Sequence, residues 1–121
     1  MWVFTLDGFY SVVQQREFCS PDEVVVRSRV REDLDRMLAR LERVSVDCEE
    51  PPPVLSFVGT DYAYRAVVKR SEWADYLKGA GEGVTYPSFK DRATSGDPAR
   101  RAVYGEVWER MWRWQQERRD E

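Results

Sequence analysis

The stretch that decides the fold runs from residue 24 to residue 44 and reads VVVRSRVREDLDRMLARLERV. Its first seven residues alternate between two faces, which predicts a β-strand over Val24–Val30. One face carries valines and a serine, and the other carries Val25, Arg27 and Arg29. From Glu32 the period becomes helical, because apolar residues recur at the spacing of one helix face. Those residues are Leu34, Met37, Leu38, Leu41 and Val44.

Two strands are expected before this stretch. Trp2–Thr5 and Phe9–Val13 are rich in aromatic and β-branched residues, and Asp7-Gly8 lies between them. Asp-Gly between two such runs is a strong local signal for a hairpin turn. A single bent strand with a bulge at Gly8 is the alternative.

Three further strand candidates follow the helix. Residues 44–50 form a short one that three prolines end, and Val54–Val58 forms a second. The run Tyr62–Lys69 is the best strand in the chain because it is long and rich in β-branched and aromatic residues.

A short helix is expected after the third of these strands. Ser71 suits its N-cap, and Trp73, Tyr76 and Leu77 supply its buried face. The glycines at 79, 81 and 83 are expected to end it. Val84–Tyr86 is then a candidate for a last, short edge strand, because a proline follows it.

The chain ends in a long predicted helix. Asp97-Pro98 is a capping residue followed by proline at the first helical position, which predicts a start at Pro98 and an end near Arg118. The order of elements from Val24 onward matches the split βαβ arrangement of ferredoxin-like domains. We therefore expect one α+β domain over residues 1–121, ferredoxin-like, with an N-terminal β-hairpin and a long C-terminal helix.

Composition excludes several chemistries. None of the 121 residues is histidine, which rules out Ser-His-Asp and Cys-His catalysis and removes the usual general base near neutral pH. Without histidine a zinc site would need cysteine and carboxylate ligands, which is rare, so we expect no metal and no cofactor. Phosphate-binding glycine loops are also missing. An enzymatic activity is therefore not favoured.

Charge and cysteine usage point to a compartment. The net charge is −3, so bulk attraction to nucleic acid or to a membrane is not expected, although a local basic patch is compatible with it. Cys19 and Cys48 lie far apart and form no CxxC pair, so we expect free thiols in a reducing compartment, while their pairing stays open. The expected location is the cytoplasm, because no apolar run reaches the ~20 residues of a membrane helix.

A candidate ligand site follows from the faces of two predicted strands. On Tyr62–Lys69 the tyrosines and Val68 share one face, and Arg65 lies on the other. If Arg27 and Arg29 project from the same side as Arg65, three guanidinium groups offer bidentate donors to phosphate or carboxylate. The candidate ligand-binding residues are Arg27, Arg29, Asp61, Tyr62, Tyr64 and Arg65.

The same residues also have a purely structural explanation. In it, Arg65 is expected to pair with Asp61 or Asp47 across the sheet, and Tyr62 and Tyr64 are expected to lie in the core with their hydroxyls hydrogen-bonded. This explanation is favoured over the ligand site, because cross-strand ion pairs are common.

The C-terminal helix is unusually rich in tryptophan. Its apolar residues form two neighbouring stripes that together cover a broad arc. One stripe is Val103, Val107, Met111 and Trp114, and the other is Tyr104, Trp108 and Trp112. The arc either packs on the sheet, which is favoured, or forms an interface with a second copy or another protein. The candidate interface residues are Tyr104, Trp108, Met111 and Trp112.

Several motifs carry a resemblance to a known family. They are Met1-Trp2-x-Phe4-Thr5 with Gly8-Phe9-Tyr10-Ser11-Val12-Val13, Gly59-Thr60-Asp61-Tyr62-x-Tyr64-Arg65, Trp73, Phe89-Lys90, and Tyr104 with Val107-Trp108 and Met111. In these motifs the chain resembles a family of small uncharacterised bacterial proteins, over nearly its whole length. The resemblance implies one intact domain and carries no catalytic residues.

Two classes of function remain. The favoured one is a non-enzymatic binding or protein-interaction module that self-associates, as a homodimer, or binds a protein partner. The alternative is a nucleotide- or RNA-binding protein, conceivably a metal-dependent nuclease, that uses the arginine-bearing sheet face. A nuclease would need clustered carboxylates, and only Asp61, with Asp7 second, is a candidate. Nucleic acid is therefore a less favoured partner.

Overall fold

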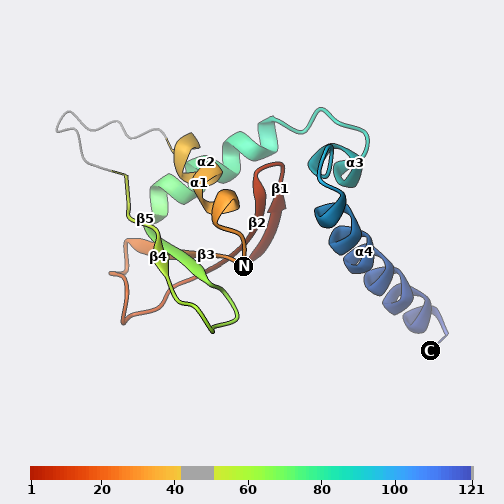
Figure 1. Cartoon of the computed structure of the whole chain (residues 1–121), viewed down its shortest axis with the longest axis horizontal. Coiled ribbons are helices and arrows are strands. Elements are labelled where there is room, and N and C mark those ends of the chain that lie inside the picture. Colours follow the sequence, from red (N-terminus) through yellow and green to blue (C-terminus); the bar gives the residue numbers. More distant parts are fainter. Residues whose placement is uncertain (42–50, 121) are drawn as a thin grey trace. The chain divides into compact units, whose positions relative to one another are not determined.

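The computed structural model describes residues 1–41 and 51–120 (Figure 1). The chain divides into two compact units, Met1–Val84 and Thr85–Glu121. The first unit carries the sheet, and the second consists of two helices. The expectation of one domain over residues 1–121 stays a prediction.

The first unit is an α+β structure built on a five-stranded sheet. Every pairing in the sheet is antiparallel, and the strand order is β1-β2-β3-β5-β4. The strands are β1 Trp2–Thr5, β2 Gly8–Val13, β3 Glu23–Ser28, β4 Leu55–Ser56 and β5 Tyr64–Lys69. The helices are α1 Arg31–Arg40 and α2 Arg70–Glu82. The predicted N-terminal hairpin is confirmed, with Leu6 and Asp7 between its strands.

The ferredoxin-like arrangement is not confirmed, because the strand order differs. That arrangement needs a strand after α2 to pair beside β3. Residues 84–86 form no strand, and β2 occupies this position beside β3 instead. The physical reason is that the N-terminal hairpin already supplies backbone partners to that edge of β3, so no unpaired edge is left for a later strand there.

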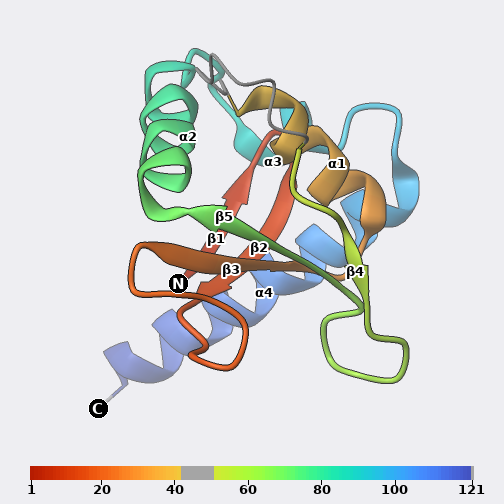
Figure 2. The same cartoon turned by 90° about the vertical axis from the view of Figure 1, so that its left-hand side faces the viewer.

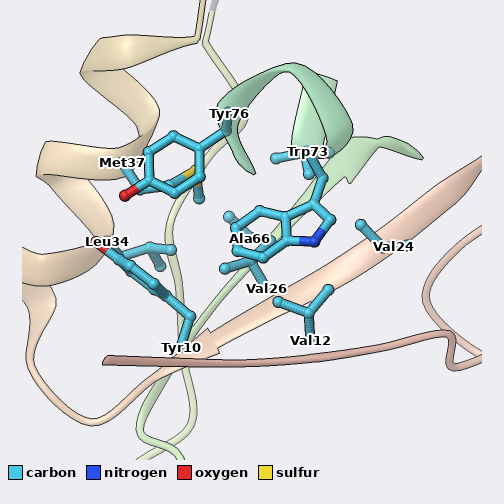
Figure 3. Packing of buried hydrophobic residues seen from close by; sticks show 10 residues of the cluster. Tyr10, Val12, Val24, Val26, Leu34, Met37, Ala66, Trp73 and Tyr76 are labelled. Atoms are coloured by element: carbon cyan, nitrogen blue, oxygen red, sulfur yellow. The ribbon is translucent and has the colours of Figure 1, made fainter. Parts of the chain in front are cut away.

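Both helices of the first unit pack on the same face of the sheet (Figure 2). The valines of β3 that the alternation assigned to one side, Val24 and Val26, lie under them. Figure 3 shows Trp73 of α2 above Val26 and Val12, and Leu34 of α1 between Tyr76 and Tyr10. The remaining members of this core are Met37, Ala66 and Val68.

The predicted helix boundaries need correction. Helix α1 ends at Arg40, with Leu41 as its C-cap. Val44 and the predicted strand over residues 44–50 fall outside the described residues. Helix α2 begins at Arg70, one residue before the predicted cap, because Glu72 accepts a hydrogen bond from the backbone N–H of Lys69 at 3.0 Å. Two of the three glycines lie inside α2, and Gly83 is its C-cap.

A buried carboxylate ties α1 to the N-terminal hairpin. Asp33 of α1 accepts from the backbone N–H of Phe9 at 3.2 Å and from Arg36 Nη2 at 2.6 Å. Its carbonyl accepts from the Tyr10 hydroxyl at 2.5 Å. Gly8 makes this approach feasible, because a Cβ at that position would lie 2.2 Å from Asp33 Cγ. The hairpin is therefore held against α1 by polar contacts as well as by apolar packing.

A second buried carboxylate ties the hairpin turn to both helices. Asp7 Oδ1 accepts from Arg40 Nε of α1 at 2.8 Å, and Oδ2 accepts from the Tyr76 hydroxyl of α2 at 2.7 Å. Tyr76 also shares a hydrogen bond with Thr5 Oγ1 at 2.8 Å. Burial, above all, raises the pKa of both Tyr76 and Tyr10 well above the ordinary tyrosine value.

The second unit is a helix pair, α3 Phe89–Ala93 and α4 Pro98–Arg119. The predicted start of α4 is confirmed, because the Asp97 side chain accepts from the backbone N–H of Arg100 at 3.0 Å and Pro98 follows it. Phe89 of α3 lies parallel to Tyr104 of α4, with ring centroids 6.3 Å apart. In the part of the chain that the structure describes, neither α4 nor any other helix is long and apolar enough to cross a membrane.

Substituting Gly8→Ala is expected to destabilise the protein by about 2–4 kcal/mol, because the new methyl group displaces the Asp33 carboxylate from its donors. Urea unfolding measures the change. Gly79→Ala is the matched control, since a Cβ there meets no atom within 4 Å and lies in a helix. It is expected to stabilise by up to about 1 kcal/mol. Equal effects of the two substitutions would contradict the assigned contact.

The stability of the protein is expected to fall as the pH rises above about 10. Burial raises the pKa of Tyr10 and Tyr76 in the folded chain, so the unfolded chain loses these protons first. Stability is therefore complete below the ordinary tyrosine pKa and declines above it, by up to about 1.4 kcal/mol per pH unit for each group. Unfolding free energies from pH 8 to 11 measure the slope. Tyr76→Phe should be less stable at pH 8 but show a shallower slope, and equal slopes would count against the assignment.

Candidate functional site

The register of the sheet brings the predicted arginines together. Arg27 of β3 lies directly opposite Ser11 of β2 and Arg65 of β5. Direct cross-strand partners share a face, so Arg27 and Arg65 both project from the side of the sheet opposite α1 and α2. Arg29 lies one residue beyond the end of β3, and its guanidinium group lies over the same Tyr62 ring as that of Arg27, which places it on the same side. We call this side the arginine face and define it by Arg27, Arg29 and Arg65.

Arg65 is the buried member of the arginine face. The residue is 9% exposed, and its guanidinium carbon lies 5.0 Å from the ring centre of Phe57 and 6.0 Å from that of Phe18. Its Nη1 donates to Gln15 Oε1 at 3.3 Å, while its Nε is buried and has no hydrogen-bond partner among the described residues. A buried donor without a partner costs free energy, so the environment of Arg65 is less favourable to its charge than water would be.

Arg27 and Arg29 share one aromatic ring. Their guanidinium carbons lie 4.6 Å and 4.2 Å from the ring centre of Tyr62. Arg27 Nη2 donates to Ser11 Oγ at 2.6 Å, and Arg29 Nε donates to the backbone carbonyl of Asp61 at 3.2 Å. Rings and neutral oxygens therefore hold both side chains in place without removing their charge.

No carboxylate neutralises the arginine face among residues 1–41 and 51–120. The ion pairs of the described residues include none with Arg27, Arg29 or Arg65. The expected pair between Arg65 and Asp61 is therefore not formed, and Asp47, the other expected partner, lies outside the described residues. Like charges directly opposite one another on a sheet are destabilising. The Arg27–Arg65 pair therefore keeps a concentrated positive charge that an anion would stabilise.

The structure separates the two predicted tyrosines. Tyr64 packs against the core, as predicted. Tyr62 does not share a face with Tyr64, because it precedes β5 and its ring lies under the guanidinium groups of Arg27 and Arg29. Strand alternation does not apply outside a strand, which is why that prediction was wrong. Asp61 is exposed and contributes its backbone carbonyl.

Four residues of the site were missed from the sequence. They are Ser11, Gln15, Phe18 and Phe57. The alternation of the strand over Phe9–Val13 carried a signal for Ser11, since it places that hydroxyl on the face opposite Tyr10. The other three come from segments outside the strands, where no local period predicts the direction of a side chain.

Exposed aromatic rings continue the arginine face along the hairpin. Trp2 is 74% exposed, and Phe4 is also exposed. The ring of Phe9 lies 4.5 Å from that of Phe4 and 6.2 Å from that of Trp2. The guanidinium carbon of Arg29 lies 5.7 Å from the centre of the Phe9 ring. Cationic and aromatic side chains thus form one continuous surface.

The carboxylates that the sequence suggested as metal ligands do not form a metal site among the described residues. Asp7 is held by Arg40 and Tyr76. Within the described ranges, no three acidic or cysteine side chains come together in a group that could hold a metal ion. Cys19 is a free thiol that donates to the carbonyl of Gln15, and Cys48 lies outside the described residues.

The predicted interface residues of α4 divide into two groups. Tyr104 is buried, packed against Phe89 of α3. Trp108, Met111 and Trp112 are each about half exposed, at 59%, 55% and 48%. The two tryptophan rings stack on each other, with centroids 6.4 Å apart.

No protein-family model, curated protein or solved structure matches this chain. The resemblance to a family of small bacterial proteins, which the motifs alone carry, therefore stays a prediction. The function of the chain is inferred from the chemistry of its own residues.

Proposed function

We propose that this protein is a non-enzymatic binding module whose arginine face takes an anionic group, a phosphate or a carboxylate. The observation that carries the proposal is the direct pairing of Arg27 with Arg65, with Arg29 beside them and no carboxylate among the described residues paired to any of the three.

Preorganisation supports the proposal. The rings of Tyr62, Phe18 and Phe57 hold the guanidinium groups in fixed places, so a ligand need not order flexible side chains. Each guanidinium presents several donors in a planar fork, which matches the oxygens of a phosphate or a carboxylate. Binding an anion therefore relieves repulsion between the arginines at little cost in entropy.

A second candidate is a single-stranded nucleic acid, which the exposed rings of the hairpin favour. Trp2 and Phe4 offer flat surfaces on which bases stack, and Arg29 lies beside the neighbouring Phe9 to meet a phosphate. The net charge of −3 works against it, since sequence-independent binding depends on overall positive charge. The simple anion site is therefore the favoured function.

Inorganic phosphate is expected to raise the melting temperature of the protein at constant ionic strength. A phosphate concentration of about ten times the dissociation constant should add roughly 1.4 kcal/mol to the free energy of unfolding, which raises the melting temperature by a few degrees. Replacing two surface arginines, Arg27→Gln with Arg29→Gln, should remove the shift, which scanning fluorimetry measures. Acetate and citrate form a parallel arm that distinguishes a carboxylate site from a phosphate site.

Arg92→Gln is the matched control, because Arg92 is exposed and lies in α3 of the other unit. This variant should keep the full stabilisation by phosphate. A wild-type protein that none of the three anions stabilises would refute the anion site. Retention of the shift in the Arg27/Arg29 double variant would refute the assigned residues.

For the second candidate, a short single-stranded RNA should bind and displace about three counterions, one for each arginine. The logarithm of the binding constant should then fall with the logarithm of the salt concentration with a slope near about −2. Trp2→Ala should weaken this binding by roughly tenfold or more, because a stacked base is lost. Fluorescence anisotropy measures both. Phosphate binding that Trp2→Ala leaves unchanged, together with no RNA binding by the wild type, would restrict the site to small anions.

A further inference from the structure

An exposed tryptophan stands on the same side of the sheet as the arginine face. Trp2 is 74% exposed, and its cross-strand partner is Ser11 of β2. Ser11 is in turn the cross-strand partner of Arg27 on β3. Because direct cross-strand partners share a face, the register places Trp2, Ser11 and Arg27 in one row across three strands.

The backbone fixes the position of Trp2 within this row. The amino group of Met1 donates to the Val12 carbonyl at 2.9 Å, and the Val12 N–H donates to the Met1 carbonyl at 2.8 Å. The next pair along the ladder, Trp2 with Ser11, is therefore a pair without hydrogen bonds between its members. Side chains in such a pair approach most closely, with Cβ atoms about 5 Å apart. The indole thus stands in a defined place beside Ser11.

Two contacts draw the accessible cations toward Trp2. Arg27 Nη2 donates to Ser11 Oγ at 2.6 Å, so the guanidinium group of Arg27 lies over β2, the strand next to β1. The guanidinium carbon of Arg29 lies 5.7 Å from the centre of the Phe9 ring, and that ring meets the indole of Trp2 edge to face at 6.2 Å. One phenyl ring therefore separates an exposed indole from a cation. A ligand that carries both a flat ring and an anion can reach the two at once.

We infer that the ligand of the arginine face is a nucleoside monophosphate, which stacks its base on Trp2 and places its phosphate against Arg27 and Arg29. The inference rests on the proposed anion site and names the class of ligand that this site takes. A phosphate monoester carries about two negative charges at neutral pH, which two guanidinium groups balance through bidentate donors. The base needs an open aromatic surface, which the exposed indole of Trp2 supplies. The sugar then lies over Phe9.

The arrangement of the charges favours a single nucleotide over a polymer. The guanidinium carbons of Arg27 and Arg29 lie 4.6 Å and 4.2 Å from the centre of the same Tyr62 ring, and Arg65 lies opposite Arg27. The three charges thus converge on one place. A single-stranded polymer is bound by cations and rings that follow its backbone over several nucleotides. A cluster of charge beside an open indole instead fits one phosphate and one base.

Isothermal titration calorimetry of the full chain, at constant ionic strength, compares adenosine monophosphate with ribose 5-phosphate and with adenosine. Ribose 5-phosphate presents the same monoester without a base, and adenosine presents the base without a charge. Adenosine monophosphate is expected to bind about tenfold more tightly than ribose 5-phosphate, because its base is stacked. Adenosine should bind at least about tenfold more weakly than adenosine monophosphate, because the charge-assisted contacts to the arginines are missing.

Substitutions separate the two halves of the ligand. Trp2→Ala should lower the affinity for adenosine monophosphate to that for ribose 5-phosphate and leave the latter unchanged, whereas Trp2→Phe keeps a smaller ring and should retain part of the difference. Arg27→Gln with Arg29→Gln should weaken the binding of both phosphates. Trp114→Ala is the matched control, because it removes an exposed tryptophan from α4 of the other unit, and it should bind both compounds as the wild type does. Thermal unfolding checks that each variant folds.

The possible failures are distinguishable. Equal affinities of the wild type for adenosine monophosphate and ribose 5-phosphate would overturn the inference and leave the anion site intact, and so would a Trp2→Ala variant that keeps the tenfold difference. A single-stranded RNA whose affinity rises steeply with its length, far above that of the monophosphate, would overturn the inference in favour of a polymer. If none of the phosphate compounds binds, the anion site itself fails and the inference fails with it.

Discussion

Strand β3 is hydrogen-bonded on both sides, to β2 and to β5, and the rest of the first unit depends on this double pairing. Its alternation divides the sheet into two chemically different faces. Val24 and Val26 lie under the helices, and Arg27 lies on the opposite side between Ser11 and Arg65. A slip of one residue in this strand would place the arginine in the core, so the same register fixes both the fold and the site.

The protein treats its buried charges in two opposite ways. On the helix side, Asp7 and Asp33 each meet an arginine at 2.8 Å or less and further donors, which makes that network structural. On the other side, Arg65 is nearly as buried but meets an amide oxygen and two aromatic rings. A buried charge that is held by neutral groups has lost hydration without gaining a counterion. That difference separates a satisfied core network from a candidate binding surface.

Local sequence determined most of the elements. Period-two alternation predicted β3 and a period of 3.6 predicted α1, because burial of one face fixes those periods. Aromatic and β-branched residues on either side of Asp7-Gly8 predicted β1 and β2. The capping pair Asp97-Pro98 fixed the start of α4, since the orphan backbone donors of a helix must be satisfied locally. Alternation also predicted the face of the strand that carries Arg27, although the strand ends at Ser28, before Arg29. The absence of histidine excluded whole classes of catalysis on composition alone.

The tertiary structure decided the strand order, the register between distant strands and the partners of the arginines, none of which a local sequence pattern contains. The strand order followed from β2 occupying the edge of β3 that a later strand was expected to fill, which is a competition between distant segments. The register between β3 and β5 brought Arg65 opposite Arg27. The position of Tyr62 under two arginines, and the contribution of Phe18 and Phe57, come from segments without a regular period. The tertiary structure also decided the partner of each arginine. An arginine can contact a carboxylate, an aromatic ring or an amide, and these groups lie far from it in the chain.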